Sequence, residues 1–233
     1  MKRVLFTVLG IAVVAGAGWA AWFFGRPFGR TEVPILMYHR LGESRSDMWT
    51  VLPEDFREQM RQLRDRGYTT ILPGDLVEFA RGRKDLPPKP VIITFDDGSL
   101  SVKEIAGPVL RQYGFRAIVY IVPGFTGEDA MRRGKCEGDP CLTWPEIRKM
   151  HQEGTFVFGA HSMSHVHGCM QRDAENEIAG SFKAIEEKAG FKPASFSYPF
   201  NEGAGDHAIE KIVERVGFTT AVTCTEKAAR VGR

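Results

Sequence analysis

Short apolar and β-branched runs recur along the chain and alternate with stretches of helical period. Around Phe56 and again around Ile178, apolar side chains repeat at i, i+4 and i+7, which predicts helices with one buried face. The apolar runs themselves predict about seven strands. These runs cover residues 33–37, 68–71, 91–95, 117–122, 155–158, 195–198 and 219–224.

The alternation of strands and helices sets the expected fold class. It predicts an α/β protein in which helices cover a parallel sheet. About seven strands within about two hundred residues favour a distorted, incomplete (β/α) barrel over a complete eightfold one. Residues 81–90 contain three prolines and form a loop that leads into the strand at Val91.

The N-terminus carries a separate signal. Val4 to Phe24 contains no charged residue, and a helix of that length spans about 30 Å, the thickness of a bilayer core. Lys2 and Arg3 precede it, and aromatic residues crowd its far end. The sequence therefore predicts a membrane anchor or signal segment over residues 1–30 and a catalytic domain over residues 31–233. Either reading places the domain outside the cytoplasm, since the alternative to a single-pass anchor is a signal peptide cleaved near Ala15-Gly16-Ala17.

Charge and cysteine content narrow the classes of partner. The formal net charge is +2 without a long basic block, so a nucleic-acid partner is not expected. Cys136 and Cys141 bracket the turn-forming sequence Glu-Gly-Asp-Pro, which predicts a small disulfide-closed loop in an oxidising compartment. A zinc knuckle is the alternative reading. Cys169 and Cys224 remain unassigned, and nothing in the sequence sets the oligomeric state.

Three clusters of polar or aromatic residues follow predicted strands. They are TFDDG at 94–98, GAHSMSH at 159–165 and YPF at 198–200. In α/β folds with parallel strands, function gathers at the carboxyl ends of the strands. We therefore expect the three clusters to meet on one rim.

Two adjacent carboxylates at the end of an apolar strand require an electrostatic partner. Asp96 and Asp97 follow the run at 91–95, where a buried ionised carboxylate is costly without a cation or strong donors. His161 and His165 stand four residues apart and supply two nitrogen donors. Together with one carboxylate they make a donor set that suits Zn²⁺ or a related divalent ion such as Co²⁺, Ni²⁺ or Fe²⁺. The second carboxylate is then available as a general base.

These motifs carry a family resemblance. TFDDG, HSMSH and FSYPF, with the opening VPILMYHRLGE, resemble the polysaccharide deacetylases with a NodB-homology domain, a carbohydrate esterase family. The resemblance covers roughly residues 33–224 and implies a distorted (β/α) barrel that removes acetyl groups from N-acetylglucosamine polymers, usually with zinc. It implies that Asp96 is the catalytic base and that the metal ligands are Asp97, His161 and His165. The FxYPx form is similar to the subgroup that acts on exported poly-N-acetylglucosamine.

The chain departs from the family pattern at two places. Ser197 stands where many members carry an arginine that orients the base, and no histidine follows His207 to act as the general acid. His39 is the expected acid, as in relatives with a similar YHR opening; the alternative is a structural histidine. The segment Tyr198-Pro199-Phe200 is expected to contribute to the substrate and oxyanion site. Tyr38, Trp144, Tyr198 and Phe200 are candidates for stacking on sugar faces, and core packing is the alternative for each of them.

The expected function is metal-dependent removal of N-acetyl groups from a polysaccharide that contains N-acetylglucosamine, with release of acetate. The glycan is poly-N-acetylglucosamine, peptidoglycan or a chitin-like polymer. Two alternatives stay open at this point. One is an O-acetyl esterase acting on xylan-like glycans, and the other is a catalytically impaired, membrane-tethered glycan-binding protein.

Overall fold

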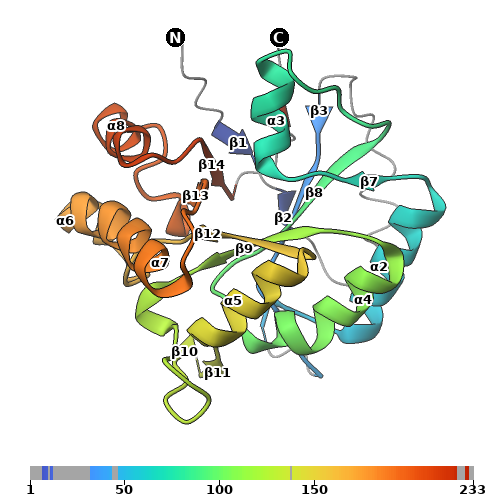
Figure 1. Cartoon of the computed structure of the whole chain (residues 1–233), viewed down its shortest axis with the longest axis horizontal. Coiled ribbons are helices and arrows are strands. Elements are labelled where there is room, and N and C mark those ends of the chain that lie inside the picture. The colour runs from blue at the N-terminus through green and yellow to red at the C-terminus, as the bar shows by residue number, and fades with distance from the viewer. Residues whose placement is uncertain are drawn as a thin grey trace.

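The fold is built on one curled parallel sheet. The computed structural model describes residues 7–9, 11–12, 32–43, 47–136, 138–224 and 229–230. Six strands form the centre of the sheet in the order β4-β8-β9-β12-β13-β14, and every neighbouring pair is parallel (Figure 1). They are β4 (Ile35–Tyr38), β8 (Pro90–Phe95), β9 (Ala117–Ile121), β12 (Phe156–Ala160), β13 (Ser195–Ser197) and β14 (Thr220–Thr223).

The predicted strands and the predicted fold class are confirmed. Each of the seven apolar runs contains a strand, because the run at 68–71 holds β7 (Thr69–Thr70), which pairs in parallel with the start of β8. The curvature of the sheet gives a half-barrel, in agreement with the expected incomplete (β/α) barrel (Figure 1). The proline-containing segment at 81–90 is a connection that leads into β8.

Helices other than α3 cover the outer side of the curved sheet (Figure 1). The periodic stretch around Phe56 forms α2, and the stretch around Ile178 continues from η3 into α7, which confirms both predicted helices. The helices are α2 (Pro53–Asp65), α3 (Pro73–Ala80), α4 (Gly107–Tyr113), α5 (Trp144–Glu153), α6 (Cys169–Glu175), α7 (Ser181–Ala189) and α8 (His207–Val216), with the short turns η1 (Val102–Ala106), η2 (Pro123–Phe125), η3 (Asn176–Gly180) and η4 (Pro199–Asn201).

Alternation along β8 assigns its side chains to two cores. Val91, Ile93 and Phe95 belong to the large cluster that includes residues of the outer helices, whereas Ile92 belongs to a smaller cluster that includes Leu76 of α3. Successive side chains of a strand point to opposite faces of the sheet. Asp96 follows Phe95 and therefore points to the same face of the sheet as Ile92. This is the face toward the interior of the half-barrel.

The residues near the N-terminus differ from the prediction. Thr7–Leu9 (β1) pairs in parallel with β14, and Ile11–Ala12 (β2) pairs in parallel with β4. The predicted helix is wrong for these five residues, because their backbone groups bond to the two edges of the sheet. The rest of the predicted span lies outside the described residues. Within the described ranges, no helix combines the length and apolar character needed to cross a bilayer.

Short two-stranded pairs lie outside the main sheet. β3 (Glu32–Val33) pairs with β15 (Ala229–Arg230), and β5 (Arg40–Leu41) pairs with β6 (Thr50–Val51). The loop that follows η2 contains the antiparallel pair β10 (Lys135–Cys136) and β11 (Asp139–Pro140).

The cysteines of this loop correct a second prediction. Cys136 and Cys141 are both buried, and no disulfide joins them. The register of the hairpin places Cys136 opposite Asp139, and Cys141 instead makes a bridge to Ser99 of the main body. The hairpin is held by backbone pairing and by docking onto residue 99, without the covalent link that the spacing suggested.

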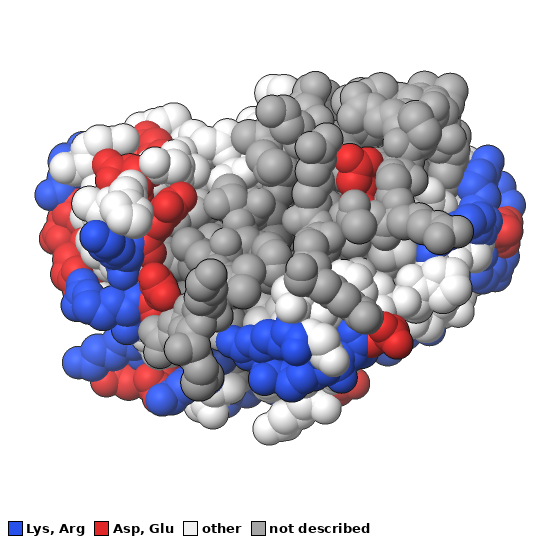
Figure 2. All heavy atoms as spheres, turned by 90° about the horizontal axis from the view of Figure 1, so that it is seen from above, with Lys and Arg blue, Asp and Glu red and all other residues white. Residues whose placement is uncertain are grey.

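Charges of both signs are interspersed on the surface. Figure 2 shows Lys and Arg beside Asp and Glu around the described part of one face. Many of these groups pair, as on α2, where Arg61 contacts Glu58 at 2.6 Å and Asp65 at 2.7 Å. Exposed pairs of this kind stabilise a fold by at most about 1 kcal/mol. Their main consequence is a surface with little net field, as the small net charge predicts.

Candidate active site

The register of the parallel strands aligns the ends of the motif-bearing strands on one rim. Tyr38 pairs with Phe95, so His39 and Asp96 are the next residues along neighbouring strands. His161 directly follows β12, which lies beyond β9 in the same sheet. Since all of these strands run in the same direction, their carboxyl ends meet at one edge. The structure therefore brings together the motifs that the sequence predicted to converge.

Asp97, His161 and His165 form a compact cluster of potential ligands. Asp97 Oδ1 lies 3.8 Å from His161 Nε2 and 3.4 Å from His165 Nε2. One ligand atom from each of the three residues lies within 4.8 Å of the other two. A single cation can contact atoms at this spacing, because zinc binds nitrogen and oxygen ligands at about 2.0 to 2.2 Å.

The protonation of the cluster fits a bound cation. His161 Nδ1 lies 2.9 Å from the carbonyl oxygen of Ser197, which can only accept, so Nδ1 carries the proton and the lone pair of Nε2 faces Asp97. Burial lowers the pKa of His161, which keeps the ring neutral as a ligand must be. Among the described residues, no hydrogen bond reaches the buried Oδ1 of Asp97. Because such an oxygen is costly without a partner, the site fits a divalent ion.

Asp96 has the environment of a general base. Its side chain is almost completely buried, and burial together with the charge of Asp97 raises its pKa to about 7, against the opposing influence of His39 and Ser197. The Ser197 hydroxyl donates a hydrogen bond of 3.3 Å to Oδ2, whereas no hydrogen bond reaches the buried Oδ1 from the described residues. A base with a pKa near neutrality accepts a proton efficiently at neutral pH.

Ser197 links Asp96 to the cluster of potential ligands. Its hydroxyl contacts Asp96 and its carbonyl oxygen accepts the proton of His161, so one residue of β13 orients both. The sequence identified Ser197 only as a departure from the arginine of the family pattern. The sequence could not show the partner of this hydroxyl, because Asp96 follows β8, which is separated from β13 by β9 and β12 in the sheet.

A buried carboxylate that the sequence reasoning missed holds the loop of His165. Glu177 Oε2 accepts the N–H groups of Met163 at 2.8 Å and Ser164 at 2.9 Å, and its Oε1 accepts the Ser164 hydroxyl at 2.6 Å. The Ser162 hydroxyl accepts the N–H of His165 at 3.0 Å. These bonds fix a tight turn between the two histidines, and nothing in the periodicity of η3 separates Glu177 from a solvent-facing acid.

The backbone around this rim adopts conformations that side chains usually avoid. Positive φ in a residue other than glycine costs about 1 to 2 kcal/mol and is concentrated at functional sites. Six described non-glycine residues have positive φ. All but Lys89 belong to the three motifs of the rim or directly follow one of them: Asp97, Ser162, His165, Phe200 and Asn201.

His39 lies at the same rim, half-buried against an exposed aromatic ring. Its ring centroid is 4.5 Å from that of Trp49, which the sequence analysis did not single out and which is 38% exposed. Burial lowers the pKa of His39, and the charges of Asp96 and Asp97 raise it. Its role as the general acid stays a prediction, since these contacts suit an acid and a structural histidine alike.

The predicted sugar-stacking residues divide into two groups. Tyr38, Trp144 and Tyr198 are at most 4% exposed, so their rings form part of the core and the stacking prediction is wrong for them. Phe200 is 40% exposed and stacks on the ring of the surface residue His167 at 3.6 Å. Pro199 is buried at the start of η4, which presents Phe200 beside the cluster of ligands (its ring lies 4.6 Å from that of His165).

The comparison with protein families decides the class of this site. A family model described as polysaccharide deacetylase matches residues 83–221, more than half of the chain, and this range contains Asp96, Asp97, His161 and His165. The chain belongs to the polysaccharide deacetylase family. The resemblance seen in the three motifs is thereby confirmed.

Several members of the polysaccharide deacetylase family are similar over much of the chain. YxkH of Bacillus subtilis (strain 168), which is named as a polysaccharide deacetylase, is 29% identical over 201 residues, 85% of this chain and 66% of its own length. The poly-β-1,6-N-acetyl-D-glucosamine N-deacetylase of Escherichia coli (strain K12) is 25% identical over 61% of this chain and 22% of its own length. The chain thus spans less than two thirds of both relatives. The structure of IcaB from Ammonifex degensii is 27% identical, covers 89% of this chain and 93% of its own, and superposes with a TM-score of 0.71.

Proposed function

We propose that the protein is a metal-dependent deacetylase that hydrolyses the N-acetyl groups of a polysaccharide containing N-acetylglucosamine. The observation that carries this proposal is the placement of Asp96 beside the cluster of Asp97, His161 and His165. His161 Nε2 lies 3.8 Å from Asp96 Oδ2, the same distance that separates it from Asp97 Oδ1. One carboxylate is thus available for a cation and the other for a proton.

The donor set selects the class of cation. Two neutral imidazole nitrogens and one carboxylate oxygen suit Zn²⁺ first, with Co²⁺, Ni²⁺ and Fe²⁺ as alternatives. When bound, such an ion polarises the acetamide carbonyl group and acidifies water. His161 is oriented for this by its bond to the carbonyl oxygen of Ser197, and His165 by the turn that Glu177 holds.

The remaining chemistry belongs to residues of the chain. Asp96 accepts a proton from the attacking water, and the Ser197 hydroxyl keeps its carboxylate in position. His39 donates a proton to the amine as the carbon–nitrogen bond breaks, so that water is consumed and acetate and a glucosamine unit are formed. A backbone N–H near Phe200 stabilises the developing oxyanion, where loss of one such donor typically costs about 3 kcal/mol.

The identity of the glycan is supported by the relatives. The Escherichia coli relative is named for its action on poly-β-1,6-N-acetyl-D-glucosamine, and the FxYPx sequence of this chain has the form associated with that subgroup. Peptidoglycan and chitin-like polymers carry the same acetamide group and are the next substrates to test. A polymer of this kind lies outside the cytoplasm, so the proposed function requires export of the domain, which stays a prediction.

One experiment separates this proposal from its rivals. The full chain is incubated with N-acetylated glucosamine polymers and with O-acetylated xylan, and released acetate is measured for the wild type and for Asp96→Asn. We expect acetate from the N-acetylated polymers, a loss of at least a hundredfold in the variant, and little release from xylan. Equal or faster release from xylan would establish the esterase reading. Binding of the polymers without any release would establish a glycan-binding protein.

A further inference from the structure

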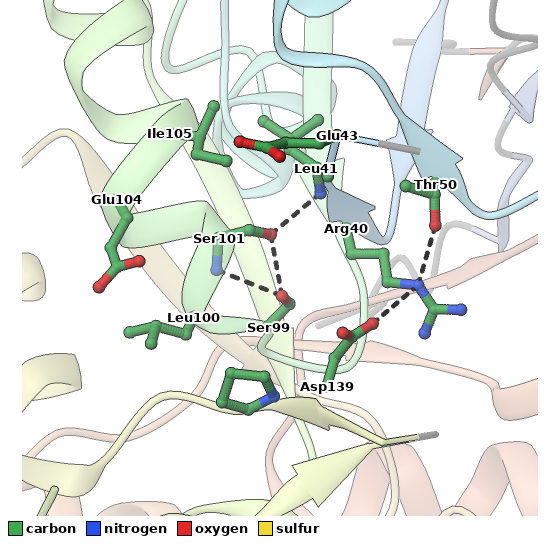
Figure 3. A pocket seen from close by; sticks show the side chains of 12 residues that line it. Arg40, Leu41, Glu43, Thr50, Ser99, Leu100, Ser101, Glu104, Ile105 and Asp139 are labelled. Atoms are coloured by element: carbon green, nitrogen blue, oxygen red, sulfur yellow. Dashed lines mark hydrogen bonds and ion pairs between the residues drawn. The ribbon is translucent and has the colours of Figure 1, made fainter. Parts of the chain in front are cut away.

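A polar pocket lies directly beside the catalytic rim. It is a cavity of about 340 Å³ between β5, the segment that leads into η1, and the strand β11 (Figure 3). Its lining combines hydroxyl groups, charged groups and apolar side chains, among them Ser99, Ser101, Leu100 and Ile105. Pockets of about 300 Å³ and above are typical of small-ligand sites. The mixture of polar groups with apolar patches fits a sugar ring, which has hydroxyl groups at its edge and C–H groups on its faces.

Three chain segments contribute residues both to the pocket and to the candidate active site, so the two adjoin. Arg40 follows His39, and Ser99 stands two residues after Asp97. On the third segment, Trp49 packs against His39 while the next residue, Thr50, lines the pocket. Because Trp49 is 38% exposed between the two sites, its ring offers a surface for a chain that passes from one to the other.

Hydrogen bonds hold the lining in a defined arrangement. Arg40 Nε donates to the Thr50 hydroxyl at 3.1 Å and lies 3.0 Å from Asp139 Oδ2 (Figure 3). The Ser101 hydroxyl accepts the N–H of Leu41 at 3.0 Å and bonds to the Ser99 hydroxyl at 2.9 Å. These contacts join β5, η1 and β11, so the polar groups are oriented before a ligand arrives. Pre-oriented groups lower the entropy cost of binding.

The charge of the lining favours a cationic ligand. Glu43, Glu104 and Asp139 line the pocket with a single guanidinium, that of Arg40, which is also paired with Asp47. Within the described ranges, neither Glu43 nor Glu104 has a cation within 4 Å; the nearby Arg133, whose pKa Glu104 helps to raise, is itself paired with Glu146 at 2.7 Å. An ammonium group is attracted to such a site, whereas a neutral acetamide is not.

We propose that this pocket binds a second sugar unit of the glycan, next to the unit that loses its acetyl group, and prefers it with a free amine. The inference rests on the proposed function, because deacetylation is what creates glucosamine units in the chain. The pocket then binds a glucosamine unit that an earlier deacetylation has formed. Its consequence is that a partly deacetylated chain is a better substrate than a fully acetylated one.

The kinetic test compares two pentasaccharides of β-1,6-linked N-acetylglucosamine, one fully acetylated and one carrying a single glucosamine unit. We expect the wild type to have a KM about two- to fivefold lower for the second, the range of one partly exposed ion pair. Glu104→Gln should remove this preference, and Glu187→Gln, an exposed change on α7, should preserve it. A wild type without preference, or a Glu104→Gln protein that retains it, would overturn the proposal.

A binding measurement keeps the pocket separate from the reaction. Asp96→Asn protein is titrated by calorimetry with a glucosamine pentasaccharide, alone and combined with Glu104→Gln or Trp49→Ala. We expect each added change to weaken binding by about two- to fivefold or more, whatever the turnover. If binding weakens in this way but the wild type releases no acetate from any glycan, the proposed function is refuted and the pocket is supported. If the wild type turns over normally but both double variants bind as tightly as Asp96→Asn, the pocket alone is refuted.

Discussion

Replacement of Ser197 by alanine tests how the base is held. The substitution removes the hydroxyl that donates to Asp96 Oδ2 and retains the backbone carbonyl that accepts the proton of His161. A hydrogen bond to a charged group contributes about 1.5 to 3 kcal/mol, and the distance of 3.3 Å is long for a hydroxyl donor, so we take the lower value. About 1.4 kcal/mol corresponds to a factor of ten, or to a change of about one in the pKa of Asp96.

The sign of the effect follows from the charge of the base. The bond stabilises the carboxylate and so lowers the pKa of Asp96. Its loss raises that pKa, and activity that requires the carboxylate is then lost at a higher pH as the solution is acidified. The assay is kcat/KM for acetate release between pH 5 and pH 9, with metal content measured in parallel. We expect the acidic limb of Ser197→Ala to move up by about one pH unit, with similar rates well above it. An unmoved limb at full activity and full metal content would refute the role given to Ser197.

Three further predictions concern stability and the metal. In chelator at pH 8, the free energy of unfolding of Asp96→Asn should exceed that of the wild type by up to about 4 kcal/mol, because the raised pKa of about 7 makes wild-type folding take up a proton. Denaturant unfolding at several pH values should show this gap close toward pH 4, and a gap that does not depend on pH would contradict the prediction. Gly98→Ala should lower the free energy of unfolding by about 1 to 2 kcal/mol, since φ is 74° and its Cβ would lie 3.1 Å from Ile121; an unchanged denaturant midpoint would contradict this. Added Zn²⁺ should stabilise the wild type by about 2.7 kcal/mol at a hundredfold excess over its Kd, but not His165→Ala, with the exposed His207→Ala as the control in the same thermal-shift assay.

The fold and the ligand cluster could be predicted because both depend on local signals. Each apolar run is long enough to specify a buried strand, and parallel pairing then aligns the strand ends whatever the loops do. The pairs Asp96–Asp97 and His161–His165 follow such strands directly, so topology alone brings them together.

The other parts of the site depend on contacts between distant segments. Ser197 meets Asp96 across 101 positions of the chain, and Glu177 reaches the 161–165 turn from a helix whose period does not distinguish it. The disulfide prediction for Cys136 failed for the same reason, since spacing cannot supply the register of the hairpin. The sequence also cannot distinguish a buried aromatic residue such as Trp144 from one that stacks on a sugar, because tertiary packing decides which rings are buried.

Metal-dependent acetate release is the most direct test of the account. The full chain is freed of metal with a chelator, divided, and assayed on poly-β-1,6-N-acetylglucosamine with and without one equivalent of Zn²⁺, beside Asp97→Ala. We predict that acetate release is absent without metal, returns with Zn²⁺ in the wild type, and does not return in the variant. Release that persists in the metal-free wild type, or that Zn²⁺ restores equally in Asp97→Ala, would contradict the site described for this protein.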